Sequence, residues 1–554
     1  MQWLEKIVRP EIWKMAGYSS ARMEMTDVSG MIQLDANENP YLPYLTSKSH
    51  TNNINRYPHP QPDAVLARLA AVYKVSPKQV LVGRGMDEIM DVLVRVFCVP
   101  YKDNIIITPP TYGYYEVIAD IAGIQVKKVA LDINNGFSLD AAKVINAANQ
   151  NTKIIFLCTP NNPTGNVLPL KDIEQIAKNL PNVIIAVDEA YIEFATAKSA
   201  STIMENYNNI VVMKTLSKAY AFAGVRVGTL IANPEIIKVA RKVLAPYPIP
   251  VPVAGLILEA ISPFGLELAN SHIELIKLER DRVMSYLNKT PGIYVYPSEA
   301  NFLLLKVDNA NAVYKDLLAK GIILRNRGRD VENTIRFTIG TPEENDLVLR
   351  ALGVQLEITK HKDRHAVFSR KTNETEILAR INLDKTAPIK VHTGIGFFDH
   401  MLEQLAKHGG FSLELSAHGD THIDYHHTVE DVAIVIGQVL KHALGDKRGI
   451  NRYGFVLPMD EACAFATIDL SGRGVLVYEA EFKNAQIGDF PVELVEHFFI
   501  SLADQLEAAI HLKVTGDNAH HMVEGLFKAF ARALNQAISQ SANNTAIPST
   551  KGTL

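Results

Sequence analysis

Cysteine is scarce in this chain of 554 residues. Cys98, Cys158 and Cys463 lie far apart and form no CxxC spacing. This pattern argues against both a disulfide framework and a thiolate metal site. Free, scattered thiols fit a reducing compartment, so we expect a cytoplasmic protein.

The chain also lacks long apolar runs and a strong charge of either sign. No run of about 18 apolar residues is present, and the start "MQWLEKIVRPEIWKM" has no basic segment followed by an apolar core. The formal net charge is −4, which argues against a globally basic, nucleic-acid-binding surface. We therefore expect neither a membrane nor a nucleic acid as partner.

The length points to at least two domains with different patterns. From about residue 80 to 235, apolar runs alternate with helix-length stretches, which predicts an α/β sheet of buried parallel strands; the runs are "NIIITPP", "TKIIFLCTP", "NVIIAVDEA", "NIVVMKTLS" and "VGTLIAN". A smaller mixed segment, 265–352, ends in a predicted helix. We expect the first domain at 1–353, a basic, polar linker at 354–366 and a second, histidine-rich domain at 367–554.

Polar residues follow the predicted strands, where ligands of such sheets bind. Ser217 and Lys218 end one run, and Arg226 follows after a turn. A lysine amine forms an imine with an aldehyde cofactor, while a hydroxyl and a guanidinium suit a phosphate. The combination indicates pyridoxal 5'-phosphate.

The chain also carries residues suited to bind the other groups of that cofactor. Asp188 is available for its ring nitrogen, Asn162 and Tyr191 for its 3'-oxygen, and Tyr112 for stacking on its ring. The glycine-containing start of a predicted helix offers backbone amides to its phosphate; these residues are Gly85, Met86 and Asp87. Each feature alone is equally compatible with a surface pair, a turn or a helix cap, and only their order on successive strand ends favours the cofactor.

Motifs in this part resemble histidinol-phosphate aminotransferase, a fold type I transferase that depends on pyridoxal phosphate. They are "LDANENP", "NRYPHP", "TPNNPTGN", "VDEAYIEF", "TLSKAYAFAGVRVG" and "LRNRGRDVENTIRFTIGT". The resemblance implies a large parallel-rich sheet domain plus a small α+β domain, with Lys218 as the imine-forming residue that also moves the proton. It further implies that Tyr57 reaches the cofactor phosphate across a dimer interface, and that Tyr18, Arg325 and Arg336 hold the substrate.

Alternatives for this part remain open. The same cofactor serves aromatic aminotransferases and threonine-phosphate decarboxylases, and the two arginines also fit surface ion pairs. Two guanidinium forks suit a site that accepts both a phosphate and the carboxylates of glutamate.

An unusual pattern, two adjacent histidines followed by a glutamate, occurs twice in the second part, in "DYHHTVED" and "NAHHMVEG". On a helix, residues four apart share a face, so His426 and Glu430 can bind one metal while His427 is turned away by about 100°. In the second copy, His520 and Glu524 share one helix face, and His521 is the residue that is turned away from it.

Each copy is preceded by a lone histidine, His400 or His497, which indicates a duplicated unit. By this symmetry each metal receives one lone histidine, one member of a histidine pair, and the His/Glu couple of the other copy. Such ligands suit Mn, Zn or Fe. A single copy would more often be a solvated helix face, and it is the two matched copies that favour metal sites. The zinc-protease motifs are absent, and the order disfavours a ferritin-like site.

This part resembles imidazoleglycerol-phosphate dehydratase, an α+β duplicated fold of the ribosomal protein S5 domain 2-like kind. Its motifs are "RKTNETEI", "TGIGFFDHMLEQLAKHGG", "HIDYHHTVEDVA", "NRYGF", "DLSGRG", "VEHFF", "GDNAHHMVEGLFKAF" and "PSTKGTL". The resemblance implies two Mn²⁺ ions per site, one on His400, His427, His520 and Glu524, and one on His426, Glu430, His497 and His521.

The same resemblance assigns substrate contacts and the proton carrier. Glu374 and His408 contact the substrate, and its phosphate is bound by Arg452, Arg473, Ser549 and Lys551. Either Glu374 or Glu524 carries the proton. Tyr425 stands where relatives often have an aspartate, so the carboxylate that supports the adjacent histidine is not identified by sequence.

Together the two resemblances imply consecutive steps of histidine biosynthesis. Imidazole glycerol phosphate is dehydrated to imidazole acetol phosphate, which then receives the amino group of glutamate. They also imply a homo-oligomer that combines aminotransferase dimers with a 24-subunit dehydratase shell. A different hypothesis makes the second part a metal-assembled scaffold without chemistry.

Overall fold

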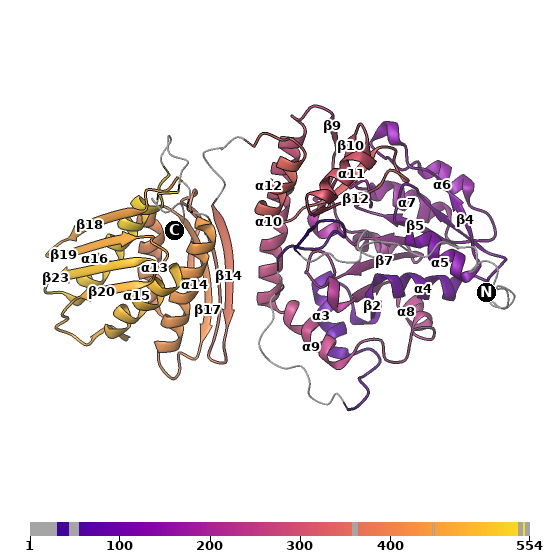
Figure 1. Cartoon of the computed structure of the whole chain (residues 1–554). Helices are drawn as coiled ribbons and strands as arrows, with labels where there is room; N and C mark the ends of the chain where they lie inside the picture. Colours follow the sequence, from indigo (N-terminus) through magenta and orange to yellow (C-terminus); the bar gives the residue numbers. More distant parts are fainter. Residues whose placement is uncertain are drawn as a thin grey trace. The chain divides into compact units, whose positions relative to one another are not determined.

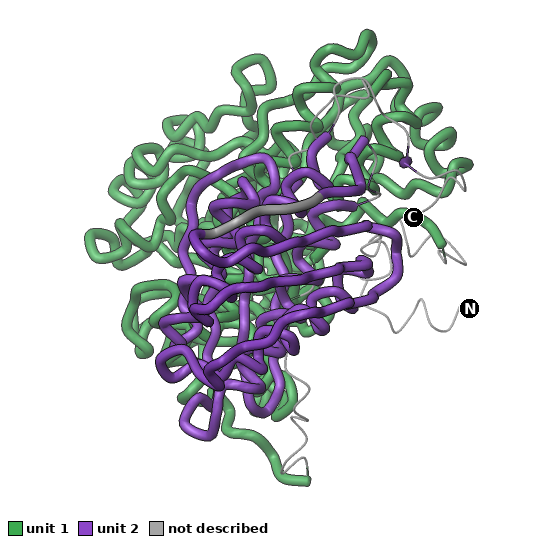
Figure 2. Tube along the Cα trace, turned by 90° about the vertical axis from the view of Figure 1, so that its left-hand side faces the viewer, with its two compact units in different colours: residues 1–356 green, residues 357–554 purple. Residues whose placement is uncertain are grey.

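The computed structural model describes residues 30–41, 43, 55–356, 364–445, 447, 449–540 and 547–548, with only the backbone of 455–459 (Figure 1). The chain divides into two compact units, residues 1–356 and 357–554 (Figure 2). Each unit has its own hydrophobic core. The two units are therefore described separately.

The first unit is built on a seven-stranded sheet of order β2-β8-β7-β6-β5-β3-β4. Its strands are β2 (Val80–Arg84), β3 (Asn104–Ile107), β4 (Gln125–Lys128), β5 (Thr152–Cys158), β6 (Ile184–Asp188), β7 (Ile210–Thr215) and β8 (Val227–Ile231). The Ile- and Val-rich strands are almost completely buried in the middle of the sheet, as the continuous apolar runs predict.

One expected strand direction is wrong. The run "VGTLIAN" was expected to be parallel, but β8 is antiparallel to both β2 and β7. Only a loop with the short 3₁₀ helix Ala223–Val225 connects β7 to β8. A parallel connection needs a longer crossover, usually a helix. The remaining neighbours from β7 to β4 are parallel.

Helices pack around this sheet (Figure 1). They are α3 (Asp63–Tyr73), α4 (Gly85–Phe97), α5 (Tyr114–Ala122), α6 (Ala141–Ala147), α7 (Leu170–Asn179), α8 (Pro234–Ala240) and α9 (Val251–Ala260). Helix α4 starts directly after β2, and Asp188 ends β6. Ser217 and Lys218 follow β7, so one edge of the sheet gathers these side chains.

A smaller part of the first unit has an antiparallel sheet of order β12-β13-β10-β9. Its elements are β9 (Ile293–Tyr296), β10 (Phe302–Val307), β12 (Arg325–Asn326), β13 (Thr334–Thr338), α10 (Pro263–Leu287), α11 (Ala310–Ala319) and α12 (Pro342–Ala351). Strand β1 (Ile32–Gln33) pairs with β11 (Ile322–Ile323). This pairing holds residues 34–40 against β13, where the Thr338 amide donates to the Leu34 carbonyl (3.2 Å).

The structure describes both ends of the expected linker, 354–366. Val354 is buried in the core of the first unit, and the first strand of the second unit begins at His365. Arg364 is already bound to Asp384 of that unit. The independence of the two domains stays a prediction.

The second unit contains two four-stranded sheets of matching order, β14-β15-β17-β16 and β18-β19-β23-β20. The strands are β14 (His365–Lys371), β15 (Thr375–Asn382), β16 (Ile389–His392), β17 (Ser412–Gly419), β18 (Tyr453–Met459), β19 (Ala462–Asp469), β20 (Val475–Glu479) and β23 (Ala509–Thr515). In each sheet the last pair is parallel and the others are antiparallel. The predicted duplication is therefore visible strand by strand.

Four helices lie between these two sheets (Figure 1): α13 (Gly396–Gly409), α14 (His426–Leu444), α15 (Glu493–Leu506) and α16 (Ala519–Ile538). A small hairpin, β21 (Gln486–Ile487) and β22 (Phe490–Pro491), precedes α15. Packing of α16 on β18 depends on Gly454, because a Cβ there would lie 1.9 Å from the Ala533 carbonyl oxygen. Both histidine pairs fall at the first residues of a helix.

Within the described ranges, no single helix is both long and apolar enough to cross a membrane. The pair α9 and α10, bent by 69° at their junction, meets the length and composition criteria only when taken together.

Candidate active sites

Lys218 lies beyond the end of β7 with a buried amine. Its Nζ donates a hydrogen bond to the Ala36 carbonyl at 2.7 Å. Burial lowers the pKa of Lys218 to about 8, and the nearby positive charge of Arg336 acts in the same direction. With this pKa about a tenth of the amine is neutral and nucleophilic at pH 7, against well under a thousandth for an ordinary lysine.

Asp188 is buried at the end of β6. Its Oδ2 accepts a 2.5 Å hydrogen bond from the Tyr115 hydroxyl, and its Oδ1 accepts one from the Ala190 amide at 3.1 Å. Burial raises the pKa of Asp188 to about 6, while both hydrogen bonds oppose that rise. A carboxylate held in this way suits a buried cationic partner.

Arg336 of β13 joins the two parts of the first unit. Its Nη1 donates to Asn162 Oδ1 at 2.6 Å, and its Nη2 donates to the Asp35 carbonyl. Asn162 Nδ2 in turn donates to the Tyr191 hydroxyl at 3.3 Å. Arg325 lies opposite Arg336 in the β12–β13 register, so two guanidinium-bearing residues stand on neighbouring strands.

The start of α4 forms a backbone cradle next to Arg226. Gly85 has φ +79°, and a Cβ there would lie 2.7 Å from Arg226 Nη2. A Cβ on Gly228 would lie 2.3 to 2.5 Å from the backbone of Gly85 and Met86. Helix-start amides, a guanidinium and the buried Ser217 fit a phosphate. Asp87 Oδ2 pairs with the same guanidinium at 3.0 Å.

Two tyrosines expected at this site have different surroundings. The Tyr112 ring meets Tyr115 edge-on, with centroids 5.6 Å apart, and its hydroxyl lies 3.4 Å from Asp87 Oδ1. Tyr57 is 83% exposed and stacks on Tyr247 at 4.6 Å. An exposed aromatic pair of this kind is available to a second chain.

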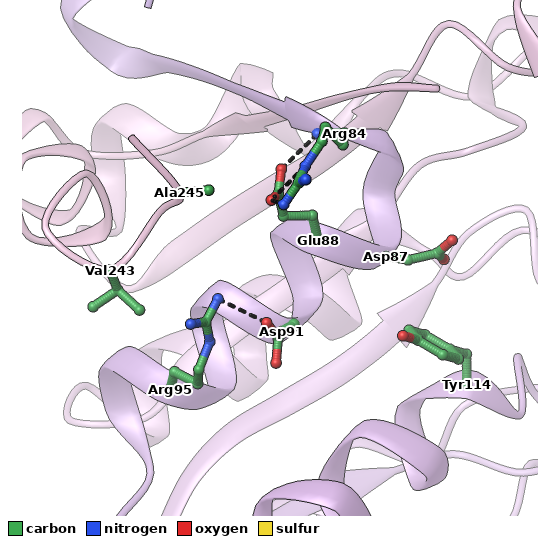
Figure 3. A pocket seen from close by; sticks show the side chains of 8 residues that line it. All are labelled: Arg84, Asp87, Glu88, Asp91, Arg95, Tyr114, Val243 and Ala245. Carbon is green, nitrogen blue, oxygen red and sulfur yellow. Dashed lines mark hydrogen bonds and ion pairs between the residues drawn. The ribbon is translucent and has the colours of Figure 1, made fainter. Parts of the chain in front are cut away.

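A separate recess of about 420 Å³ lies along α4. Figure 3 shows its side chains, among which Arg84 pairs with Glu88 at 2.6 Å and Arg95 with Asp91 at 2.7 Å. It is lined by Arg84, Asp87, Glu88, Asp91, Arg95, Tyr114, Val243 and Ala245. The charged side chains of this recess are already paired with one another or with neighbours. Asp87 is the one expected cofactor-binding residue that lines it.

In the second unit, His400, His520 and Glu524 form a group whose ligand atoms all lie within 4.8 Å of one another. Glu524 Oε2 is 3.4 Å from His520 Nε2, and Oε1 is 3.9 Å from His400 Nε2. Burial works to raise the pKa of Glu524, but the ion pair with Lys528 at 2.8 Å, together with His400 and His520, lowers the pKa. Glu524 is thereby kept as a carboxylate.

A matching group contains His426, Glu430 and His497. Glu430 Oε2 lies 3.6 Å from His497 Nε2 and 4.0 Å from His426 Nε2. The buried Nε2 of His497 makes no hydrogen bond within the described part of the chain. An orphaned ring nitrogen facing a histidine and a carboxylate fits a divalent metal ion.

His427 and His521 belong to neither group. His427 Nδ1 lies 3.1 Å from Asp420 Oδ2, and His521 Nδ1 lies 2.9 Å from Glu461 Oε2. Each ring is turned by 87° from its neighbouring histidine. Within one chain the structure therefore brings together three of each four expected ligands.

The expected substrate residues lie on both repeats. Glu374 is exposed in the turn between β14 and β15, and its carbonyl accepts from the Asp420 amide at 3.1 Å. His408 Nε2 lies 3.1 Å from Gln404 Oε1 in the last turn of α13. Burial, with added repulsion from Lys528, lowers the pKa of His408, which favours a neutral imidazole.

Arg452 binds both Asp469 oxygens, at 2.5 and 3.0 Å, and donates to the Pro548 carbonyl at 3.0 Å. Pro548 directly precedes Ser549 in the sequence. Arg473 is exposed between β19 and β20. Tyr18, Ser549 and Lys551 lie outside the described residues.

Comparison with known proteins identifies a family for each unit. The model of the family "Aminotransferase class I and II" matches residues 29–352. Histidinol-phosphate aminotransferase from Stenotrophomonas maltophilia is 41% identical over 355 residues, which are 63% of this chain and 96% of that protein. The chain belongs to this aminotransferase family. The enzyme of the same name from Flavobacterium psychrophilum is also 41% identical, with 63% and 98% covered.

Solved structures agree with the fold of this aminotransferase unit, residues 1–356. Histidinol-phosphate aminotransferase from Clostridium acetobutylicum matches with TM-score 0.51 and 25% identity, covering 58% of this chain and 98% of that one. The enzyme from Sinorhizobium meliloti, solved with pyridoxal-5'-phosphate, matches with TM-score 0.55 and 21% identity, covering 62% and 96%. The latter likeness supports the fold alone.

The "Imidazoleglycerol-phosphate dehydratase" family model matches residues 393–534. The chain thus joins two enzyme domains, and we call residues 357–554 the dehydratase unit. The match spans all eight expected metal ligands.

Several contacts of these sites were not predicted from the sequence. Tyr115 is one of three tyrosines in "PPTYGYY", and no pattern selects it as the partner of Asp188. Asp420 and Glu461 lie outside the two repeated sequences "HHTVE" and "HHMVE". Two further contacts could have been predicted from the sequence. Asp424 and Asn518 each stand two residues before a histidine pair, a spacing typical of helix caps. Their side chains accept hydrogen bonds from the amides of His426 (2.8 Å) and His520 (2.9 Å).

Proposed function

We propose that this chain catalyses two consecutive steps of histidine biosynthesis. The dehydratase unit removes water from imidazole glycerol phosphate to give imidazole acetol phosphate. The aminotransferase unit then transfers the amino group of glutamate to that product, which gives histidinol phosphate and 2-oxoglutarate. The observation that carries the proposal is that one chain holds both a buried low-pKa lysine beside a buried arginine and two matched His/His/Glu groups.

Pyridoxal phosphate supplies the aldehyde and the electron-withdrawing ring for the transamination. We infer that Lys218 binds its aldehyde and later moves the proton, and that Asp188 holds its ring nitrogen. Asn162 and Tyr191 are assigned to the 3'-oxygen of the cofactor, because Asn162 is hydrogen-bonded to both Tyr191 and Arg336. The phosphate is assigned to Ser217, Arg226 and the amides of Gly85, Met86 and Asp87, with Tyr112 on the ring face.

Arg336 and Arg325 are assigned to the anionic groups of the substrates. Arg336 is 6% exposed and its guanidinium lies next to Asn162. A substrate carboxylate would therefore bind to a guanidinium group that is shielded from water. Arg325 stands on the adjacent strand and offers a second fork. Tyr18 completes the substrate contacts in this proposal, and Tyr57 reaches the cofactor phosphate of a second copy.

Two Mn²⁺ ions would supply Lewis acidity and hold the imidazole ring of the dehydratase substrate. One is assigned to His400, His427, His520 and Glu524, and the other to His426, Glu430, His497 and His521. Because His427 and His521 stand apart from the two groups of their own chain, the complete sites form between copies of the chain in an oligomer.

We infer that Glu374, and not Glu524, is the proton carrier. Glu524 contacts two metal-binding histidines and is held as a carboxylate by Lys528. Glu374 is exposed in a turn beside Asp420, so its carboxyl group is free to exchange a proton with substrate. His408 is assigned to the substrate, and Arg452, Arg473, Ser549 and Lys551 to its phosphate.

The test is a set of omission experiments on the full chain. Imidazole glycerol phosphate is supplied with Mn²⁺, pyridoxal phosphate and glutamate, and each is omitted in turn. Omission of metal should abolish both products, whereas omission of cofactor or glutamate should let imidazole acetol phosphate accumulate. Absence of dehydration by a metal-loaded chain would support the scaffold hypothesis.

Substrate choice by the aminotransferase unit is tested separately. Histidinol phosphate formed from imidazole acetol phosphate should depend on glutamate, and aromatic oxo acids should be poor acceptors. Efficient amination of phenylpyruvate, or decarboxylation of threonine phosphate, would favour the two alternatives. The cytoplasmic location expected from the scattered cysteines stays a prediction.

A further inference from the structure

His427 and His521 have a feature in common that the expected ligand sets do not include: each presents Nδ1 to a carboxylate. His427 Nδ1 lies 3.1 Å from Asp420 Oδ2. His521 Nδ1 lies 2.9 and 3.1 Å from the two oxygens of Glu461. An ionised carboxylate only accepts hydrogen bonds, so the proton of each neutral ring resides on Nδ1. The lone pair is then on Nε2, which points away from the carboxylate.

Both carboxylates belong to residues at the ends of sheet strands. Asp420 directly follows β17, and its amide donates to the Glu374 carbonyl at 3.1 Å. Glu461 lies in the turn between β18 and β19, where its Oε1 accepts from the Asn518 amide at 3.3 Å. Side chains anchored to strand ends fix a ring more firmly than side chains on a free loop.

The two carboxylates occupy different places in the duplicated unit. Glu461 lies in the first hairpin of the second repeat, and the corresponding hairpin of the first repeat carries Glu374. The first repeat instead uses Asp420, at the end of its third sheet strand in the order β14-β15-β17-β16. The contact is therefore present in both repeats although duplication alone does not account for it.

The rings that these carboxylates orient are accessible. The side chains of His427 and His521 are 45% and 32% exposed, and neither belongs to the two three-residue groups. We propose that Asp420 and Glu461 are positioning residues that fix His427 and His521 as the Nδ1–H tautomer, so that Nε2 is ready to bind the metal. This inference rests on the metal sites of the proposed function and assigns two residues beyond them.

A carboxylate behind a metal-binding imidazole sets the ring orientation and raises its basicity, and loss of such a partner typically lowers metal affinity by about 10- to 100-fold. Mn²⁺ binding to the metal-free full chain is therefore measured by calorimetry and by the electron paramagnetic resonance signal of free Mn²⁺. Asp420→Ala and Glu461→Ala should each weaken binding by about 10- to 100-fold. Glu461→Gln, which keeps an acceptor oxygen, should recover part of the loss.

A matched control is Glu479→Ala, which removes an exposed carboxylate paired with Lys513 on the same sheet and should leave Mn²⁺ affinity unchanged. Thermal unfolding of the dehydratase unit, followed by circular dichroism on the same preparation, shows whether that unit of each variant is folded. Wild-type Mn²⁺ affinity in both alanine variants would overturn the proposal.

A double-substitution cycle separates positioning from a general structural role. If Asp420 acts through His427, Asp420→Ala should have no further effect on Mn²⁺ affinity in a His427→Ala chain. An equal, additive loss in that background would refute the assignment. Because the readout is metal affinity, a wild-type chain that binds Mn²⁺ but does not dehydrate its substrate would count against the proposed function and leave the positioning test intact.

Discussion

The Tyr115 hydroxyl donates a 2.5 Å hydrogen bond to Asp188 Oδ2 in the buried interior of the aminotransferase unit. The tyrosine ring is itself held by stacking on Phe156, with centroids 4.8 Å apart and planes 8° apart. The bond favours the ionised carboxyl group, whose pKa burial would otherwise raise further.

Tyr115→Phe removes that donor without removing the ring. A hydrogen bond to a charged group contributes about 1.5 to 3 kcal/mol, so we expect pyridoxal phosphate to bind about tenfold or more weakly. Its absorbance spectrum should also indicate a less protonated ring nitrogen. Titration of the cofactor-free chain measures both, with Tyr114→Phe as control because Tyr114 lines the surface recess instead. Unchanged affinity and spectrum would contradict the expectation.

The lowered pKa of Lys218 predicts how cofactor loading depends on pH. The neutral amine is the reactive form, and burial with Arg336 lowers the pKa of this lysine to about 8. The rate at which cofactor-free protein binds pyridoxal phosphate should therefore rise as the pH increases through about 8. Arg336→Gln removes a repelling charge and should move the midpoint to higher pH. A rate that rises only near the pKa of an ordinary lysine would disprove the shift.

Gly228→Ala should disrupt the phosphate cradle. Its Cβ would lie within 2.5 Å of Met86 N and closer still to the Gly85 backbone, and backbone atoms cannot yield as a side chain can. Overpacking of this kind costs about 1 to 3 kcal/mol, so we expect lower thermal stability of the aminotransferase unit and about tenfold weaker cofactor binding. Gly224→Ala is the control, since nothing lies within 4 Å of its added Cβ.

Mixed oligomers test whether dehydratase sites form between copies. His400→Ala breaks a three-residue group, and His427→Ala removes the histidine assigned to the same ion. Each variant alone should lose dehydration by more than about 100-fold. Co-expression of the two variants should restore activity, because an intact group on one copy meets an intact His427 on another. Failure to restore activity in verified mixed oligomers would place all four ligands in one chain.

The separate cores predict that the units fold independently. The fragment 364–554 keeps Arg364, β14 and the whole core of the dehydratase unit, so it should bind Mn²⁺ and dehydrate its substrate without residues 1–356. Circular dichroism and turnover measure this. A fragment that aggregates or stays inactive with metal would show that the first unit is required.

Periodic patterns predicted much of this molecule. Runs such as "NVIIAVDEA" gave the buried strands, and the four-residue spacing of His426 and Glu430 placed both on one helix face, where their atoms lie 4.0 Å apart. The direction of β8 was missed because it depends on the short connection from β7. Tyr115, Asp420 and Glu461 act through contacts between distant segments, and no local period marks such residues.

The two units share one continuous polypeptide, and this fixes their production ratio. Every translated chain delivers one aminotransferase unit and one dehydratase unit, so gene expression has no means of adjusting one against the other. At this fixed ratio, the steady concentration of the shared intermediate depends on the kinetic constants of the two sites and not on their relative amounts.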